Sequence, residues 1–145
     1  MNSLSLNKSE KSTVTKRSGP YRIMIVDDSS VIRGLLTRWI STDPSLEIVA
    51  SVANGQIAIN SLDRYDPEII VLDIEMPVMD GLTALPKILK IKPDVQVLMS
   101  STLTSKNAAI SLKAMELGAA DYVPKPTTNR EVISSSRMLD PSVVG

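Results

Sequence analysis

Residues 23–26 form an uninterrupted apolar run that stops at two adjacent carboxylates, Asp27 and Asp28. A strand that is apolar on both faces is typical of a parallel sheet, because helices cover both sides of such a sheet. After the acidic pair, Ser29 or Ser30 can cap a helix, since a hydroxyl there accepts a hydrogen bond from the first turn. The apolar residues that follow recur at helical spacing and are Ile32, Leu35, Leu36, Trp39 and Ile40. Their stripe predicts a helix that packs on the sheet.

The alternation of strand and helix continues along the chain. Further strands are predicted over residues 46–53, 68–72, 95–99 and 120–123. Further helices are predicted over residues 55–62 and 82–89, and from Thr104 or Ser105 to Leu117. Gly118 is expected to stop the last helix, and Pro86 is expected near a first turn, because it lacks a backbone N–H. This alternation implies right-handed crossovers and a doubly wound, five-stranded parallel α/β sheet.

The composition fits one ordinary domain with tails. The chain has 145 residues, 43% of them hydrophobic, and a formal net charge of zero. Residues 1–20 are basic and show no apolar periodicity, so they are predicted to be a disordered leader. No segment approaches the roughly 20 apolar residues of a membrane span, and the leader lacks a signal peptide's apolar core. We therefore expect a cytoplasmic protein that binds neither membrane nor nucleic acid.

The absence of two residue types restricts the chemistry. The sequence contains no cysteine and no histidine. The first absence removes disulfides and thiolate chemistry, and the second removes histidine-bound metals and every Ser-His-Asp or Cys-His arrangement. No glycine-rich phosphate loop is present either, so nucleotide binding has no support. The chain is not expected to be an independent enzyme, apart from accepting a phosphoryl group on itself.

Polar residues stand at the ends of four predicted strands. Asp27 and Asp28 follow the first strand, Asp73 the third, Ser101 the fourth and Lys125 the fifth. In an open parallel sheet these ends lie at one edge, where ligands bind at the point of strand reversal. Three carboxylates within ~5 Å of one another repel by about 1 kcal/mol per pair in water, and more in a cleft. Mg²⁺ suits such an oxygen-rich site, and together with Lys125 it would balance the three negative charges.

Asp73 is the candidate phosphoacceptor. It stands alone after a central strand, whereas the neighbours Asp27 and Asp28 look like a metal-holding pair. A carboxylate nucleophile can form an acyl phosphate, which places a charge of about −2 where about −1 stood before. Ser101 and Lys125 can reorganise around this new charge, so the residues indicate a switch rather than a turnover site.

These residues closely resemble the receiver domain of bacterial response regulators over residues 21–126. The matching stretches are Ile25-Val26-Asp27-Asp28-Ser29, Leu72-Asp73, Met76-Pro77, Met79-Asp80-Gly81, Ser101 and the segment from Tyr122 to Lys125-Pro126. The resemblance implies a flavodoxin-like sheet with strand order 2-1-3-4-5. The family's fifth helix is not obvious after Pro126, so residues 127–145 are interpreted as a truncated linker or a partial fifth helix.

The resemblance also implies roles for the acidic residues. Asp73 would accept phosphate from a histidine kinase. Mg²⁺ would be bound by Asp28, Asp73 and the backbone carbonyl of Glu75, with Asp27 assisting. Asp80 can cap the following helix instead of contacting the metal.

A coupled movement of the remaining site residues is implied in the same way. Ser101 would move toward the phosphoryl group, and Tyr122 would rotate inward after it. Lys125 would pair with the phosphate, aimed by a cis peptide bond between Lys125 and Pro126 that resembles the family's. The surface around the fourth helix of the family and the fifth strand would then change.

Within the receivers, the chain is similar to chemotaxis protein-glutamate methylesterases of the CheB type. The similar stretches are Asp73-Ile74-Glu75-Met76-Pro77, Ser101-Thr102-Leu103-Thr104, Gly118-Ala119-Ala120-Asp121-Tyr122 and Asn129-Arg130-Glu131-Val132. In such proteins the receiver covers the active site of a C-terminal esterase domain, and phosphorylation relieves the block. The resemblance implies a chemotaxis kinase and an attached esterase as partners. Apolar surface left bare by an incomplete fifth helix would favour a dimer.

Two other functions stay open at the level of sequence. A stand-alone receiver would act only by docking a partner protein after phosphorylation, and a longer reading frame with a Gly-x-Ser-x-Gly esterase would argue against it. A Mg²⁺-dependent phosphohydrolase would turn over small phosphomonoesters. That class is expected to have Asp-x-Asp after the first strand, where this chain has Asp27-Asp28-Ser29.

Overall fold

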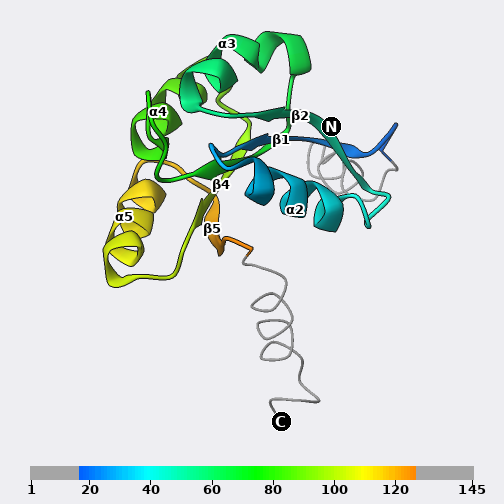
Figure 1. The fold of residues 1–145 in the computed structure, drawn as a ribbon. Coiled ribbons are helices and arrows are strands. Elements are labelled where there is room, and N and C mark those ends of the chain that lie inside the picture. Colours follow the sequence, from blue (N-terminus) through cyan, green and yellow to red (C-terminus); the bar gives the residue numbers. More distant parts are fainter. Residues whose placement is uncertain (1–16, 127–145) are drawn as a thin grey trace, which may run out of the picture.

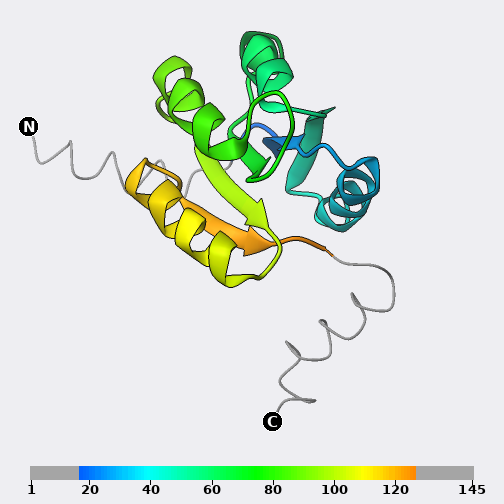
Figure 2. The same ribbon diagram turned by 60° about the vertical axis from the view of Figure 1, so that its left-hand side comes forward.

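A computed structural model describes residues 17–126. In this part of the chain, five parallel strands form one sheet in the order β2-β1-β3-β4-β5, with helices on both faces (Figure 1; Figure 2). The strands are β1 Tyr21–Val26, β2 Leu46–Val52, β3 Ile69–Asp73, β4 Gln96–Ser101 and β5 Asp121–Pro124. The helices are α2 Ser30–Ile40, α3 Gly55–Tyr65, α4 Gly81–Ile91 and α5 Ser105–Glu116. The predicted doubly wound α/β class and the strand order 2-1-3-4-5 are confirmed.

The two faces of the sheet are buried by different helices. Alternate residues of a strand point to opposite faces, so β1 divides its apolar run between two cores. Ile23 and Ile25 pack with Leu36 of α2 on one face. Met24 and Val26 belong to the larger cluster on the other face, which takes buried residues from α3, α4 and α5. A strand segment buried on both faces has to be apolar at every position, as residues 23–26 of β1 are.

The helices begin where hydroxyl, carboxylate or amide side chains can cap them. Ser29 accepts a hydrogen bond from the backbone N–H of Ile32 at the start of α2, and Thr104 accepts one from Asn107 at the start of α5. Asp80 accepts one from Thr83, so its predicted capping of α4 is confirmed. At the other end of α5, Gly118 has φ 113°, a left-handed conformation that glycine adopts without a Cβ clash.

The expected position of Pro86 was wrong. Helix α4 begins at Gly81, so Pro86 is its sixth residue and lies inside the helix rather than in its first turn. Proline has no N–H to donate to the carbonyl of Leu82, so this turn lacks one backbone hydrogen bond. The buried contacts of Leu85 and Ile88 on the same helix offset that loss.

Two predicted segments fall largely or wholly outside the described residues. The disordered leader was placed at residues 1–20, of which only 17–20 are described, and the truncated linker or partial fifth helix was placed at residues 127–145. Both therefore stay predictions. Across residues 17–126, no helix is long and apolar enough to cross a membrane.

Replacing Leu85 by alanine tests the larger core. The side chain of Leu85 is fully buried against the sheet, so we expect the free energy of unfolding to fall by about 3 kcal/mol, through lost apolar contact and a residual cavity. Leu112→Ala is the matched control, because Leu112 also lies on a helix but is 66% exposed. Denaturant unfolding should show a change within about 0.5 kcal/mol for this control. Equal losses in both variants would contradict the assignment of Leu85 to the core.

Candidate phosphoacceptor and cation site

Three carboxylates converge at the carboxyl ends of β1 and β3. One oxygen from each of Asp27, Asp28 and Asp73 lies within 4.8 Å of the others. Asp27 and Asp73 are each only 1% exposed, whereas Asp28 is exposed. They meet because β1 and β3 are hydrogen-bonded neighbours in register, with Val26 beside Leu72. The structure thus brings together the acidic residues that the sequence placed at one sheet edge.

Each buried aspartate uses one oxygen in a local turn and leaves the other without a hydrogen bond. Oδ1 of Asp27 accepts a hydrogen bond from the backbone N–H of Ser29 at 2.9 Å, and Oδ1 of Asp73 accepts one from Glu75 at 3.2 Å. Oδ2 of both side chains is buried without a hydrogen-bond partner among the described residues. Buried carboxylate oxygens without donors are unfavourable unless a cation binds them. An all-oxygen donor set of this kind fits a hard divalent cation such as Mg²⁺.

Lys125 supplies the positive charge at this edge. Its Nζ lies 2.9 Å from Oδ1 of Asp73 and 3.4 Å from Oδ2 of Asp27. Lys125 and Oδ2 of Asp27 therefore form an ion pair without a hydrogen bond. The backbone N–H of Lys125 donates to the carbonyl of Ser101 at 2.9 Å, so the end of β4 positions the lysine. One ammonium therefore faces two buried carboxylates.

The charges in this pocket shift the pKa of Asp73 and of Lys125. Burial raises the pKa of Asp73 to about 7, and the negative charge of Asp27 adds to this rise, although Lys125 opposes it. Burial alone would lower the pKa of Lys125, but the hydrogen bond and charge of Asp73 and the charge of Asp27 raise it instead. A bound divalent cation would favour the ionised form of Asp73. The pocket is thus short of positive charge.

Ser101 and Tyr122, on the neighbouring strands β4 and β5, line the same pocket. Ser101 is the last residue of β4 and is 4% exposed, while Tyr122 on β5 is 45% exposed. Both line a pocket of about 360 Å³. In the β3–β4 register Ser100 is opposite Asp73, which places Ser101 one residue further toward the edge. The structure therefore brings the two residues predicted to switch to one pocket, and their predicted movements stay predictions.

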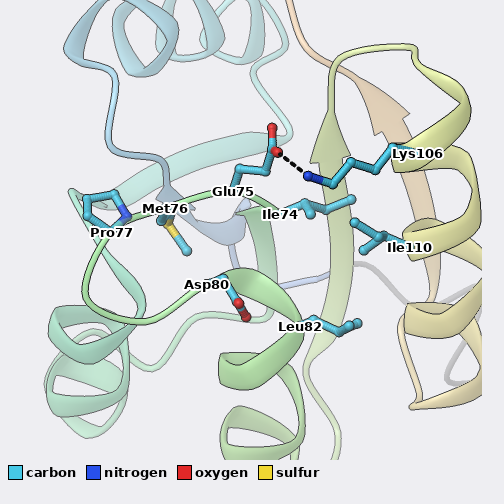
Figure 3. Close-up of a pocket in the computed structure, with 8 residues that line it drawn as sticks. All are labelled: Ile74, Glu75, Met76, Pro77, Asp80, Leu82, Lys106 and Ile110. Atoms are coloured by element: carbon cyan, nitrogen blue, oxygen red, sulfur yellow. Dashed lines mark ion pairs between the residues drawn. The ribbon is translucent and has the colours of Figure 1, made fainter.

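The loop from Asp73 to Gly81 forms one wall of a second pocket, which has a volume of about 550 Å³. Figure 3 shows Glu75 pointing toward Lys106 of α5, with Ile74 and Ile110 beneath the pair. The carboxylate of Glu75 lies 3.8 Å from the ammonium of Lys106, and both side chains are more than half exposed. The side chain of Glu75 is thus engaged with α5, while its backbone N–H donates to Asp73.

The predicted cis bond before Pro126 is wrong for this structure. Every peptide bond among the described residues, including Lys125–Pro126, is trans. The trans isomer of a bond before proline is favoured by about 0.5–1 kcal/mol, so the sequence alone does not impose the cis form. Lys125 reaches Asp73 with the trans bond in place.

Val78 is strained in the loop beside Asp73. Its φ of 72° lies in the left-handed region, which a β-branched residue rarely adopts, and its side chain is 80% exposed. Asparagine tolerates this conformation better, so Val78→Asn is expected to raise the free energy of unfolding by about 1 kcal/mol. Denaturant unfolding would measure the change. A loss of stability would mean that Val78 makes a contact that outweighs the strain.

Two residues that support the site were not predicted. Nη1 of Arg33, on α2, donates to the backbone carbonyl of Asp27 at 2.6 Å. Asn107, on α5, is 3% exposed and donates to both the carbonyl and the hydroxyl of Thr102, at 3.1 and 3.0 Å. Each of them lies near the start of a helix, and that helix directly follows a strand with a predicted site residue at its carboxyl end. This position is the sequence signal that could have found them.

Comparison with known proteins assigns the chain to a family. The sequence model of the response regulator receiver domain matches residues 23–137, most of the chain. The protein therefore belongs to the response regulator receiver family.

Within that family its curated relatives include chemotaxis methylesterases. The chain is 58% identical over 125 residues to the protein-glutamate methylesterase/protein-glutamine glutaminase of the group 2 operon of Rhodospirillum centenum, covering 84% of this chain and 32% of the relative. It is also 57% identical over 114 residues to protein-glutamate methylesterase/protein-glutamine glutaminase 1 of Rhodospirillum rubrum. That match covers 79% of this chain and 30% of the relative. The chain thus spans about a third of the length of these relatives. It is a receiver domain of the CheB type.

Solved structures agree with this assignment. The response regulator domain of Thermotoga maritima CheB superposes with a TM-score of 0.70 at 34% identity, over 81% of this chain and 90% of that one. CheY6 of R. sphaeroides, solved in complex with the P1 domain of CheA3, gives a TM-score of 0.65 at 36% identity, over 84% and 98%. The predicted family and fold are therefore confirmed.

Proposed function

We propose that this receiver accepts a phosphoryl group on Asp73 from a histidine kinase and uses the new charge as a switch. The observation that supports it best is the meeting of three carboxylates and one ammonium at a single sheet edge. A mere solvated turn would not bury two of the carboxylates to 1% exposure. The arrangement suits a group that arrives negatively charged and needs positive charge around it.

The three aspartates at this sheet edge are suited to binding a cation. Asp28, Asp73 and the backbone carbonyl of Glu75 would hold Mg²⁺, with Asp27 assisting through Oδ2, which has no hydrogen-bond partner among the described residues. When bound, the cation would stabilise negative charge on the oxygens of the incoming phosphoryl group. Lys125 already lies at hydrogen-bond distance from Asp73, so its ammonium can pair with the transferred group after a small movement.

The chemical step is an in-line transfer to a carboxylate oxygen. An oxygen of Asp73 forms a bond to phosphorus while the bond from phosphorus to the donor nitrogen of a phosphohistidine breaks, leaving that histidine with the electron pair. The product on Asp73 is an acyl phosphate. Ser101 would approach a phosphoryl oxygen, and Tyr122 would turn inward in response.

The partners follow from the relatives. CheY6 was solved with the P1 domain of CheA3, which supports a chemotaxis-type kinase as the donor. The methylesterase relatives are about three times as long as the matched region, which supports control of an attached esterase rather than a stand-alone docking role. Such a protein would act in the cytoplasm. A dimer through the fifth-helix surface depends on residues outside the described part and stays a prediction.

Phosphorylation by a small donor tests the proposal. We expect the chain incubated with acetyl phosphate and Mg²⁺ to gain the mass of one phosphoryl group, because every component of the site is present. Omitting Mg²⁺ or introducing Asp73→Asn should abolish the gain, whereas Asp63→Asn, at an exposed position of α3, should not change it. Intact-mass spectrometry measures all four conditions. An adduct that persists in Asp73→Asn would overturn the assignment of the phosphoacceptor.

A further inference from the structure

The pocket between β4, β5 and α5 is lined mainly by hydroxyl-bearing residues. It has a volume of about 360 Å³ and is bordered by the loop of residues 101–105, by Ala108 and Ser111 of α5, and by Tyr122. Ser101, the hydroxyl expected to move toward a phosphoryl group, forms part of its wall. Tyr122, at 45% exposure, lies at its rim. The pocket is therefore next to both parts of the proposed switch.

Ser111 is unusual among the hydroxyl residues on helices of this fold. It is 1% exposed, and its Oγ has no hydrogen-bond partner among the described residues. Serine and threonine inside a helix commonly donate to the carbonyl four residues earlier. Ser61 does so with Ile57, and Thr37 does so with Arg33, each at 2.7 Å. Ser111 makes no such bond, so its hydroxyl is buried beside the pocket with its hydrogen-bonding capacity unused.

The loop wall of the pocket is tied to α5 one turn before Ser111. Asn107 donates from Nδ2 to the carbonyl and the hydroxyl of Thr102, so the loop that follows Ser101 is tied to the helix that carries Ser111. The pocket is present in this structure while Tyr122 is 45% exposed. Ser101 and Ser111 are the buried residues of this pocket, and an aromatic ring that packs against them needs a partner for its hydroxyl on that side, where an unpaired phenol is unfavourable.

We propose that the Ser111 hydroxyl is the hydrogen-bond partner of the Tyr122 hydroxyl when the ring occupies this pocket. Ser111 is thus a positioning residue of the switch: it makes the inward state of Tyr122 more favourable and, through it, the phosphorylated state of Asp73. Ser111 lines the pocket, and a change between the staggered χ1 rotamers of a serine can redirect its hydroxyl toward the ring. The inference rests on the proposed function, since the ring turns inward in response to phosphorylation.

The test measures the coupling of Ser111 to Tyr122. Beryllofluoride with Mg²⁺ serves as the phosphoryl probe, and 3-fluorotyrosine labelling with ¹⁹F NMR reports the environment of Tyr122, assigned with Tyr122→Phe. Ser111→Ala should reduce the population of the inward ring and the affinity for beryllofluoride by roughly 2- to 10-fold, as expected for one lost hydrogen bond. Ser111→Thr keeps the hydroxyl and should behave as the parent. Ser105→Ala, an exposed serine bordering the same pocket, should have no effect.

Two further readouts separate this role from a purely structural one. Without beryllofluoride, Ser111→Ala should melt at the same or a higher temperature, because the hydroxyl it removes is unpaired. In a Tyr122→Phe background, Ser111→Ala should no longer change the affinity. An unchanged affinity of Ser111→Ala in the parent background, while beryllofluoride still binds, would overturn the inference and leave the proposed function standing. Failure of the parent protein to bind beryllofluoride or to form the Asp73 adduct would overturn both.

Discussion

Replacing Gly81 by alanine is expected to destabilise the fold by about 3 kcal/mol or more and to prevent phosphorylation of Asp73. A Cβ at Gly81 would lie 2.2 Å from the backbone carbonyl oxygen of Asp73 and 3.0 Å from the Cα of Ile74. Both contacts are with backbone, which cannot turn aside as a side chain can. The phosphoacceptor strand or the start of α4 would have to move. Denaturant unfolding and the acetyl phosphate assay measure the two effects.

Gly34→Ala provides the control for this substitution. Gly34 also lies in a helix, but a Cβ there would meet nothing within 4 Å. Alanine has the higher helix propensity, so this variant should gain about 0.5–1 kcal/mol in stability and keep full phosphorylation. If Gly81→Ala behaved like Gly34→Ala, the close approach between α4 and β3 would be refuted.

Replacing Lys125 by methionine is expected to lower the free energy of unfolding by about 3 kcal/mol in metal-free buffer. The side chain of Lys125 is 15% exposed and faces two carboxylates that are 1% exposed, so its removal leaves buried negative charge without a counterion. Saturating Mg²⁺ should recover much of the loss, because a cation bound to the same carboxylates restores positive charge. Thermal and denaturant unfolding with and without Mg²⁺ measure both effects.

Lys113→Met is the control for the charge itself. Lys113 pairs with Glu116 at 3.9 Å, with both side chains more than half exposed. Surface pairs of this kind contribute about 0–1 kcal/mol, so this variant should unfold almost as the parent does, and Mg²⁺ should affect it as it affects the parent. A loss in Lys125→Met that Mg²⁺ did not reduce would mean that the lysine acts by packing rather than by charge.

The sheet and its acidic edge were predictable because they depend on short-range patterns. An apolar run such as residues 23–26 indicates a strand that is covered on both faces, as in a parallel sheet. Because parallel strands end at one edge of the sheet, Asp27 and Asp73 are then expected to lie together. The caps at Ser29 and Thr104 follow from local hydrogen bonding that a sequence shows directly. The strand order, by contrast, came from resemblance alone.

The predictions that were wrong or missing depend on tertiary contacts. Pro86 was expected in a first turn, but buried neighbours on α4 stabilise the helix around it. The bond before Pro126 differs little in energy between its isomers, so its state cannot be read from the sequence. Arg33 and Asn107 were missed because their partners are backbone and loop groups brought near them only by the fold.

The local turns at Asp27 and Asp73 have a consequence for ion exchange. In each case the amide two residues later fixes the carboxylate, so the orientation of the ligand does not depend on an ion being present. A cation can therefore enter or leave without reshaping the backbone, and the receiver would stay ready for its phosphodonor while the ion exchanges with solvent.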